Sequence, residues 1–158
     1  MDLEIRWHAP FSLREATDDE DLIYVCDQLD QVTEKHGVYF FGRKFGDDIA
    51  PIYIGRAKDI RKRIGQHLTS NVRLMKAIQK ARNGERVLLT GEWIAKKGQQ
   101  EGRVLQLIEA ALIKFALAEG HEIVNDKGTK TSVHTLSMKG NRAPATKVFR
   151  STMKIEQR

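Results

Sequence analysis

The sequence is poor in cysteine and in long apolar runs, and each shortage excludes a class of protein. Cys26 is the only cysteine, so no internal disulfide can form, and the five histidines make no Cys/His cluster at zinc-ligand spacing. No apolar run approaches the roughly 20 residues that a membrane-spanning helix needs, and the amino terminus lacks the basic-then-apolar order of a signal peptide. We therefore expect a cytoplasmic protein without structural zinc, in which Cys26 is a small core residue.

Charge is distributed unevenly along the 158 residues. Residues 1–35 contain ten acids against three bases, a net charge of −7, and because the whole chain carries +6, residues 36–158 must carry +13. A positive surface of that size attracts polyanions and releases their counterions, which makes nucleic acid the leading partner. On charge alone, a merely solubilising surface stays open as the alternative.

Two segments rich in aromatic and β-favouring residues predict an antiparallel hairpin. GVYFF spans residues 37–41 and PIYIG spans residues 51–55, with a polar, glycine-bearing link between them. If the turn centres near Gly46, Tyr39 lies directly opposite Tyr53 on one face of the sheet. Two phenols would then be neighbours.

Helical periodicity follows the hairpin. Apolar residues recur every four positions from Ile60 to Leu68, and Asp59 is well placed to cap the helix that they predict. Arg63 and His67 are also four residues apart, so they form a second row beside the apolar stripe. This row is expected at the boundary between core and solvent.

Three further elements are predicted downstream. A second helix is expected over residues 72–81, a third strand over residues 86–95, and the longest helix over about residues 99–119, with Gly120 as its stop. Glu109 lies inside the apolar stripe of this last helix, where a carboxylate must be paired or must bind a cation. The stripe itself is formed by Leu105, Ile108, Leu112 and Phe115.

The two ends of the chain are assigned less structure. Residues 3–14 predict an edge strand or extended arm, and the capping box of Thr17 and Glu20 predicts a short helix leading to Cys26. Beyond Asn125 the chain is basic and has few apolar residues. Three roles stay open for it: wrapping the domain, contacting a phosphate backbone, and remaining mobile.

The residues in the middle of the chain resemble the GIY-YIG nuclease family, which includes certain homing endonucleases, some restriction enzymes and the amino-terminal nuclease of the bacterial excision-repair incision protein. Residues 37–39 (Gly-Val-Tyr) correspond to the first motif, with valine in place of isoleucine, and residues 53–55 (Tyr-Ile-Gly) match the second. Arg63 stands eight residues after that glycine, where the family has its helical arginine, and His67 follows four residues later.

A glutamate on a later helix and a following asparagine complete the resemblance, and Glu109 and Asn125 match them. The match covers roughly residues 35–126 and implies an α/β (α+β) fold of the GIY-YIG type, a three-stranded antiparallel sheet flanked by helices. Residues 1–158 are expected to form one domain, with an acidic extension before this core and a basic extension after it.

The resemblance also implies a metal-dependent endonuclease that hydrolyses DNA phosphodiester bonds. Glu109 would bind one Mg²⁺ or Mn²⁺ ion. Tyr39 would deprotonate the attacking water, which demands a lowered phenol pKa. Arg63 would clamp the phosphate oxygens, Tyr53 would hydrogen-bond Tyr39 or a phosphate, and His67 would be an alternative base or a phosphate donor.

Other residues are expected to support the site. Gly37 and Gly55 would allow close backbone approach, and Asn125 would bond backbone groups near the site. Trp7 and Trp93 are interpreted as core residues. The candidates for contacts to the nucleic-acid backbone are Arg56, Lys58, Arg61 and Lys62.

Several alternatives stay open. Glu109 could be a structural residue paired with an arginine such as Arg63, and the chain could be a DNA-binding module that has lost catalysis. A nuclease acting on RNA or on branched DNA is a further alternative. Because one site cuts one strand, a double-strand break would need a homodimer or two visits.

Overall fold

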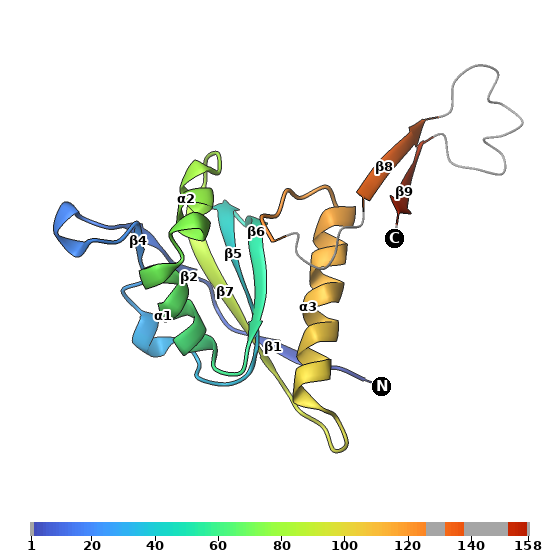
Figure 1. The fold of residues 1–158 in the computed structure, drawn as a ribbon, viewed down its shortest axis with the longest axis horizontal. Coiled ribbons are helices and arrows are strands. Elements are labelled where there is room, and N and C mark those ends of the chain that lie inside the picture. Colours follow the sequence, from blue (N-terminus) through green and yellow to red (C-terminus); the bar gives the residue numbers. More distant parts are fainter. Residues whose placement is uncertain (1, 126–131, 138–151, 158) are drawn as a thin grey trace, which may run out of the picture.

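An antiparallel sheet of five strands forms the centre of the protein, seen here in a computed structural model that describes residues 2–125, 132–137 and 152–157 (Figure 1). The strands follow the order β1-β7-β5-β6, and β2 also pairs with β7. The expected three strands are present as β7, β5 and β6, and the amino-terminal arm extends the sheet beyond β7. The strands are β1 (Ile5–Trp7), β2 (Phe11–Ser12), β5 (Gly37–Phe45), β6 (Asp48–Ala57) and β7 (Glu85–Trp93).

Helices cover both faces of this sheet. On one side lie α1 (Ile60–Ser70) and α2 (Val72–Lys80), and on the other lies α3 (Glu101–Ala118) (Figure 1). Alternation along β5 explains both contacts, because successive strand residues face opposite sides. Tyr39 joins the core beneath α1 and α2, whereas Val38 joins the core beneath α3. The protein is thus an α+β fold with helices on each face of an antiparallel sheet.

The expected register of the hairpin is wrong by two residues. Tyr39 pairs with Gly55, and Tyr53 pairs with Phe41. The turn consists of residues 46 and 47 alone, and the register shifts at a bulge where β5 passes from Phe41 to the next residue. Tyr39 and Tyr53 still share one face as diagonal neighbours, with ring centroids 6.3 Å apart.

The short helix expected before Cys26 is absent. The capping box of Thr17 and Glu20 forms, but it supports only a 3₁₀ turn, because Asp21 adopts a left-handed conformation with φ 52° and ends it. The chain then returns as a strand, and Cys26 is buried in the core as expected. The elements here are β3 (Arg14–Glu15), η1 (Asp18–Glu20), β4 (Tyr24–Val25) and η2 (Leu29–Gln31).

Two expectations about large apolar side chains are also wrong. Phe115 is 66% exposed. Because α3 packs against different strands along its length, the residues buried in its last turns are Ile113 and Ala116 instead. Trp7 is 42% exposed on the outer strand β1, where it packs edge-to-face on Phe40. Trp93 is buried as expected.

The carboxy-terminal region contributes an antiparallel pair, β8 (Ser132–Ser137) and β9 (Thr152–Gln157). The side chains of the basic tail lie outside the described residues, as do residues 126–131 and 138–151, so its three open roles stay predictions. None of the described helices is long and apolar enough to cross a membrane.

Gly37 occupies a position where β5 and β7 come very close. A Cβ atom there would lie 1.9 Å from the carbonyl oxygen of Gly91, which is far inside van der Waals contact. Because both groups belong to paired backbone, neither can move without disturbing the ladder. The close backbone approach expected at Gly37 is therefore present.

We expect Gly37→Ala to lower the free energy of unfolding by about 1–3 kcal/mol, because the added methyl overpacks the ladder. Urea unfolding provides the measurement. Gly102→Ala is the control, since a Cβ atom at that position would meet no heavy atom within 4 Å and alanine is preferred in a helix. Equal stability of Gly37→Ala and the parent would contradict this account of the strand packing.

Candidate active site on the edge strand

Helix α1 places two polar side chains beside the sheet. Its start is fixed by Asp59, whose carboxylate accepts a hydrogen bond from the backbone N–H of Lys62 at 3.0 Å. Ile60 and Ile64 are fully buried and hold the helix against the sheet. The same docking turns His67 inward, where its side chain is buried. Arg63 and His67 were expected at the boundary between core and solvent, but His67 is buried.

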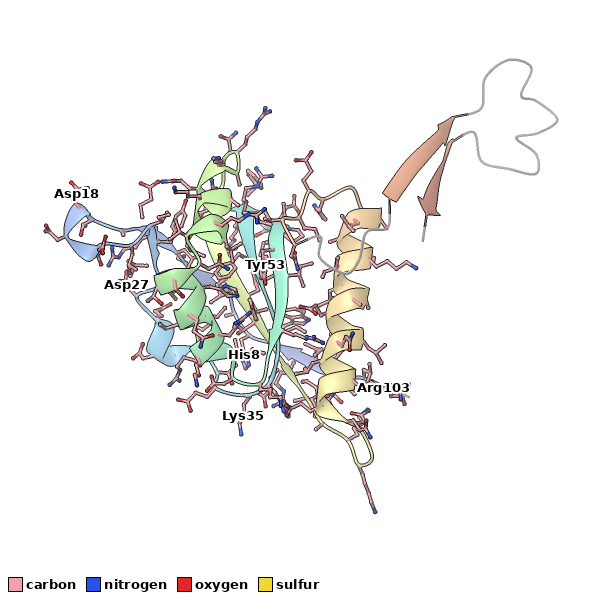
Figure 2. The ribbon with its side chains drawn as sticks, viewed as in Figure 1. His8, Asp18, Asp27, Lys35, Tyr53 and Arg103 are labelled. Carbon is pink, nitrogen blue, oxygen red and sulfur yellow. The ribbon has the colours of Figure 1, made fainter. Side chains whose placement is uncertain are left out.

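Tyr39 and His67 form the centre of the candidate site. The Tyr39 hydroxyl lies 2.7 Å from Nε2 of His67, and both residues are buried. Tyr53, labelled on β6 in Figure 2, closes the cluster, with its ring 5.4 Å from that of His67. Gly55 leaves the space that the Tyr39 ring fills, since a Cβ atom there would lie 2.5 Å from the phenol oxygen.

Asn71 determines which nitrogen of His67 carries the proton. Its side-chain oxygen accepts from the backbone N–H of Leu74 at 3.2 Å, as the N-cap of α2. The amide nitrogen must then face His67, and it lies 3.0 Å from Nδ1. Nδ1 accepts this hydrogen bond, so the proton sits on Nε2, which donates to the Tyr39 oxygen.

The site holds its histidine and its tyrosine in neutral forms. Burial, with the nearby Arg63 guanidinium, lowers the pKa of His67 to about 4. Burial and the neighbouring Tyr53 phenol raise the pKa of Tyr39, although hydrogen bonding to Arg63 opposes this shift. The lowered phenol pKa expected for a base is therefore not present in the protein by itself. Positive charge brought by a ligand would have to supply it.

Arg63 stands at the solvent side of this cluster. Its side chain is exposed, and its contact with the amide oxygen of Gln66 is long, 3.4 Å from Nη1. No carboxylate among the described residues forms an ion pair with it, so the guanidinium can accept an anion. An oxygen of that anion would lie near the Tyr39 phenol.

Glu109 is positioned on the opposite side of the sheet. It belongs to α3 and pairs with Arg56 at 3.3 Å, rather than with Arg63. Alternation along β6 is the cause, because Gly55 faces Tyr39 and the next residue faces α3. Burial raises the pKa of the Glu109 carboxyl, and Arg56 opposes that shift. The expected constellation therefore lies in two parts around one edge strand.

Asn125 fixes that edge strand. Its side-chain oxygen accepts from the backbone N–H of Ile54 at 3.2 Å, and its amide nitrogen donates to the carbonyl of the same residue. The backbone N–H of Val124 also donates to the carbonyl of Ile52 at 2.8 Å. The segment after α3 thus satisfies groups that an edge strand leaves unpaired, and it holds Tyr53 and Gly55 in place.

The four cations proposed to track a nucleic-acid backbone have different surroundings. Arg56 is engaged by Glu109. Arg61 is also engaged, because it donates to the carbonyl of Val32 and pairs with Glu34. Lys58 lies 3.9 Å from a carboxylate oxygen of Glu101, but its side chain is 83% exposed, and Lys62 is also exposed.

The resemblance implies one divalent cation, and Glu109 fits it as a single ligand. In the part of the chain that the structure describes, no group of three or more His, Cys, Asp or Glu side chains could hold a metal. Mg²⁺ is often held by one carboxylate together with water and substrate phosphates. The Glu109 carboxylate is half-buried, and burial raises its pKa although Arg56 opposes that shift. A carboxylate oxygen is a hard ligand of the kind that Mg²⁺ prefers.

Searches against family models, curated proteins and solved structures found no match to this chain. The resemblance to GIY-YIG nucleases therefore rests on the sequence motifs named above and stays a prediction.

Asn71 is the residue of the site that the sequence reasoning missed. Two signals were present: it lies four residues after His67, and it stands directly before the apolar pattern of the next helix, where asparagine is a preferred N-cap. Neither signal shows that one side chain makes both contacts, because that depends on the angle between α1 and α2.

The state of His67 makes stability depend on pH. Its pKa is about 4 in the folded protein and 6.5 in an ordinary environment, so the unfolded chain binds the extra proton between these values. The contribution of neutral His67 to the free energy of unfolding is complete above pH 6.5 and is lost as the pH falls toward 4. We expect the free energy of unfolding to drop by roughly 2 kcal/mol from pH 7 to pH 5. Urea titrations of His67→Gln should lack this component, and an identical pH dependence would contradict it.

Substitutions of Asn71 test the assigned tautomer. Asn71→Asp keeps an oxygen for the cap but replaces the amide donor with an acceptor, so we expect the proton of His67 to move to Nδ1. Nitrogen chemical shifts of the imidazole distinguish the two forms. Asn71→Ser, which keeps a cap without an amide, is the control for helix stability. An Nδ1 proton already present in the parent would overturn the assignment.

Proposed function

We propose that the protein is a metal-dependent endonuclease of the GIY-YIG type that hydrolyses DNA phosphodiester bonds. The observation that carries this proposal is the buried Tyr39 hydroxyl, hydrogen-bonded to a neutral histidine beside an exposed arginine. Gly55 packs on that phenol, and the residue that follows it engages the half-buried carboxylate of Glu109. Groups suited to a water and a phosphate therefore lie on one face of β6, and the carboxylate suited to a cation lies on its other face.

Each group has a distinct task in this mechanism. Arg63 holds the non-bridging phosphate oxygens and favours ionisation of the phenol. Tyr39 first releases its own proton to solvent and then takes the proton of the attacking water, whose oxygen bonds to phosphorus as the bond to the leaving 3′ oxygen breaks. His67 donates from Nε2 to the phenolate oxygen and stabilises it, while Asn71 keeps the imidazole in this orientation. In this mechanism His67 is a donor and not the base.

Glu109 would hold the divalent cation, together with water and phosphate oxygens. When bound, that ion supplies positive charge that polarises the phosphate and stabilises the leaving oxygen. Arg56 lies 3.3 Å from the carboxylate and is itself 39% exposed at its side chain, so it can turn to solvent or to a phosphate. Burial raises the pKa of the Glu109 carboxyl, and the Arg56 guanidinium opposes that shift and so favours the charged carboxylate.

A second candidate is a DNA-binding module without catalysis. The ion pair between Arg56 and Glu109 favours it, because the carboxylate already has a protein partner. Intact Tyr39, Arg63 and His67 favour the nuclease, since binding alone needs no buried tyrosine with this hydrogen-bonding arrangement. Nucleases acting on RNA or on branched DNA share the same chemistry, and substrate tests separate them.

We expect Glu109→Ala to reduce Mg²⁺-dependent nicking of supercoiled plasmid by at least about a hundredfold, because it removes the cation ligand. DNA affinity in EDTA should be nearly unchanged, since no phosphate-binding cation is lost. Parallel incubations with single-stranded DNA, RNA and branched DNA identify the preferred substrate, and Mn²⁺ and EDTA arms identify the metal requirement.

Glu101→Ala is the matched control, because Glu101 lies two turns earlier on α3 and also pairs with basic groups, His36 and Lys58. It should nick like the parent. Equal nicking by Glu109→Ala and the parent would exclude Glu109 as the ligand. Tight DNA binding by a parent that cuts none of the substrates would favour the module without catalysis.

A further inference from the structure

Helix α2 and the turn after it carry cations that the catalytic proposal does not use. The chain from Ile60 to Gly84 contains no aspartate or glutamate. Arg73, Lys76 and Lys80 are exposed on one face of α2, opposite the buried face of that helix. Among the described residues none of these three forms an ion pair.

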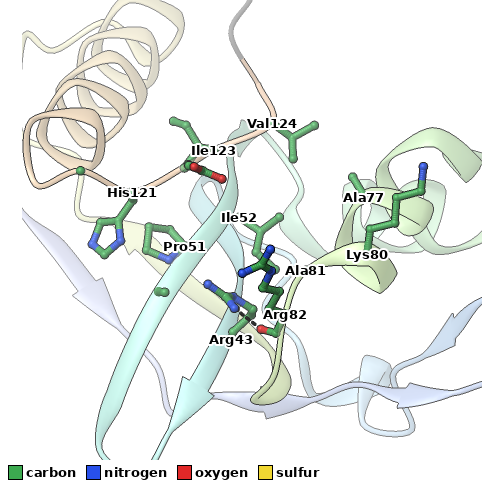
Figure 3. Close-up of a pocket in the computed structure, with 13 residues that line it drawn as sticks. Arg43, Pro51, Ile52, Ala77, Lys80, Ala81, Arg82, His121, Ile123 and Val124 are labelled. Carbon is green, nitrogen blue, oxygen red and sulfur yellow. Dashed lines mark hydrogen bonds between the residues drawn. The ribbon is translucent and has the colours of Figure 1, made fainter. Parts of the chain in front are cut away.

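Two adjoining cavities run along this face and share the side chains of Ala77, Lys80 and Val124. They have volumes of about 750 and 470 Å³. We call this continuous depression the α2 trough. Figure 3 shows its larger part, where side chains from β5, α2 and the segment after α3 surround Pro51 and Ile52. The basic residues that line the trough are Arg43, Arg73, Lys76, Lys80, Arg82 and His121.

Charge in the trough is poorly balanced by the protein. Of the residues that the structure describes, Glu122 is the only acidic one lining either cavity, although Asp18 and Asp21 line a separate cavity on the other side of Lys76. Like charges brought together without counter-charges repel one another, and a bound anion removes that cost. The trough is therefore suited to a polyanion.

Arg43 and the turn that carries Arg82 are held in place by contacts to backbone carbonyls. Arg43 donates to the carbonyl of Arg82 (Figure 3). Its guanidinium carbon lies 5.2 Å from the centre of the Phe45 ring. Arg86 donates to four backbone carbonyls, from Ile78 to Gly84, and so fixes the turn that carries Arg82. Cations positioned in advance lose less entropy when they bind.

The trough adjoins the candidate active site. Ile52 lines it and directly precedes Tyr53 in β6, and α2 begins directly after its N-cap Asn71, which bonds His67. From Arg73 to Lys80 the helix axis covers about 10 Å, a length along which each strand of duplex DNA carries about three phosphate charges. A single phosphate could not contact this whole row, whereas a strand leaving the active site could.

We propose that the α2 trough binds the phosphate backbone of duplex DNA that extends beyond the bond to be cut. This inference rests on the proposed nuclease function and adds the surface that holds the substrate. Arg73, Lys80 and Arg82 make the contacts, and they carry no base specificity because phosphates are the same in every sequence.

The test compares two full-length triple variants that each lose three positive charges. One is Arg73→Gln, Lys80→Gln and Arg82→Gln in the trough. The control is Arg6→Gln, Lys97→Gln and Arg103→Gln, on β1, in the loop before α3 and at the start of α3, where Figure 2 shows Arg103 far from α2. Fluorescence anisotropy with a labelled duplex in EDTA, over a series of salt concentrations, gives the affinity and its salt slope.

We expect the trough variant to bind roughly tenfold or more weakly and its salt slope to fall by about 2–3, while the control keeps the parent slope. Equal slopes for the two variants, or loss of single-stranded DNA binding alone, would overturn the proposal. Circular dichroism confirms that each variant is folded, and Arg73→Gln alone, at an exposed helix position, provides a milder second variant.

Nicking assays on the parent separate this proposal from the catalytic one. If the parent cuts DNA but the trough variant keeps the parent's salt slope, the nuclease proposal stands and the proposal that the trough binds DNA is overturned. If the parent never cuts but the trough variant has a reduced salt slope, the nuclease proposal is overturned and the proposal of a duplex-binding surface stands.

Discussion

The hydrogen bond between Tyr39 and His67 is the contact on which the candidate site depends. It needs a strand and a helix at a fixed separation, which the buried isoleucines of α1 provide. It also needs Gly55, because any larger residue would occupy the place of the phenol. Because the interior is closely packed, a change in the size of one of these residues would displace its neighbours and alter the hydrogen bond. Asn71 extends the same chain of hydrogen bonds into the start of α2.

Strand β6 connects the two halves of the site because it lies at the edge of the sheet. Its alternating residues face α1 on one side and α3 on the other, so Tyr53 and Arg56 serve different faces. An edge strand also exposes backbone groups, and the segment ending in Asn125 satisfies them. These hydrogen bonds hold the edge strand in a fixed position.

Burial drives the titratable groups of the site toward their neutral forms. The pKa of Tyr39 and that of Glu109 are raised, and the pKa of His67 is lowered. In each case removal from water is the largest cause, and such shifts are a frequent property of functional sites. A phosphate at Arg63 and a cation at Glu109 would change the local field in ways the protein alone does not.

Local patterns in the sequence determined the hairpin, the three helices and the spacing of Arg63 and His67, because strand and helix periods repeat within a few residues. Only the tertiary structure decided the register, where a bulge and a short turn moved the pairing. It also decided that Phe115 faces solvent and that Glu109 pairs with Arg56. These outcomes depend on how α3 crosses a twisted sheet and on which face each strand residue occupies, and no local pattern contains that information.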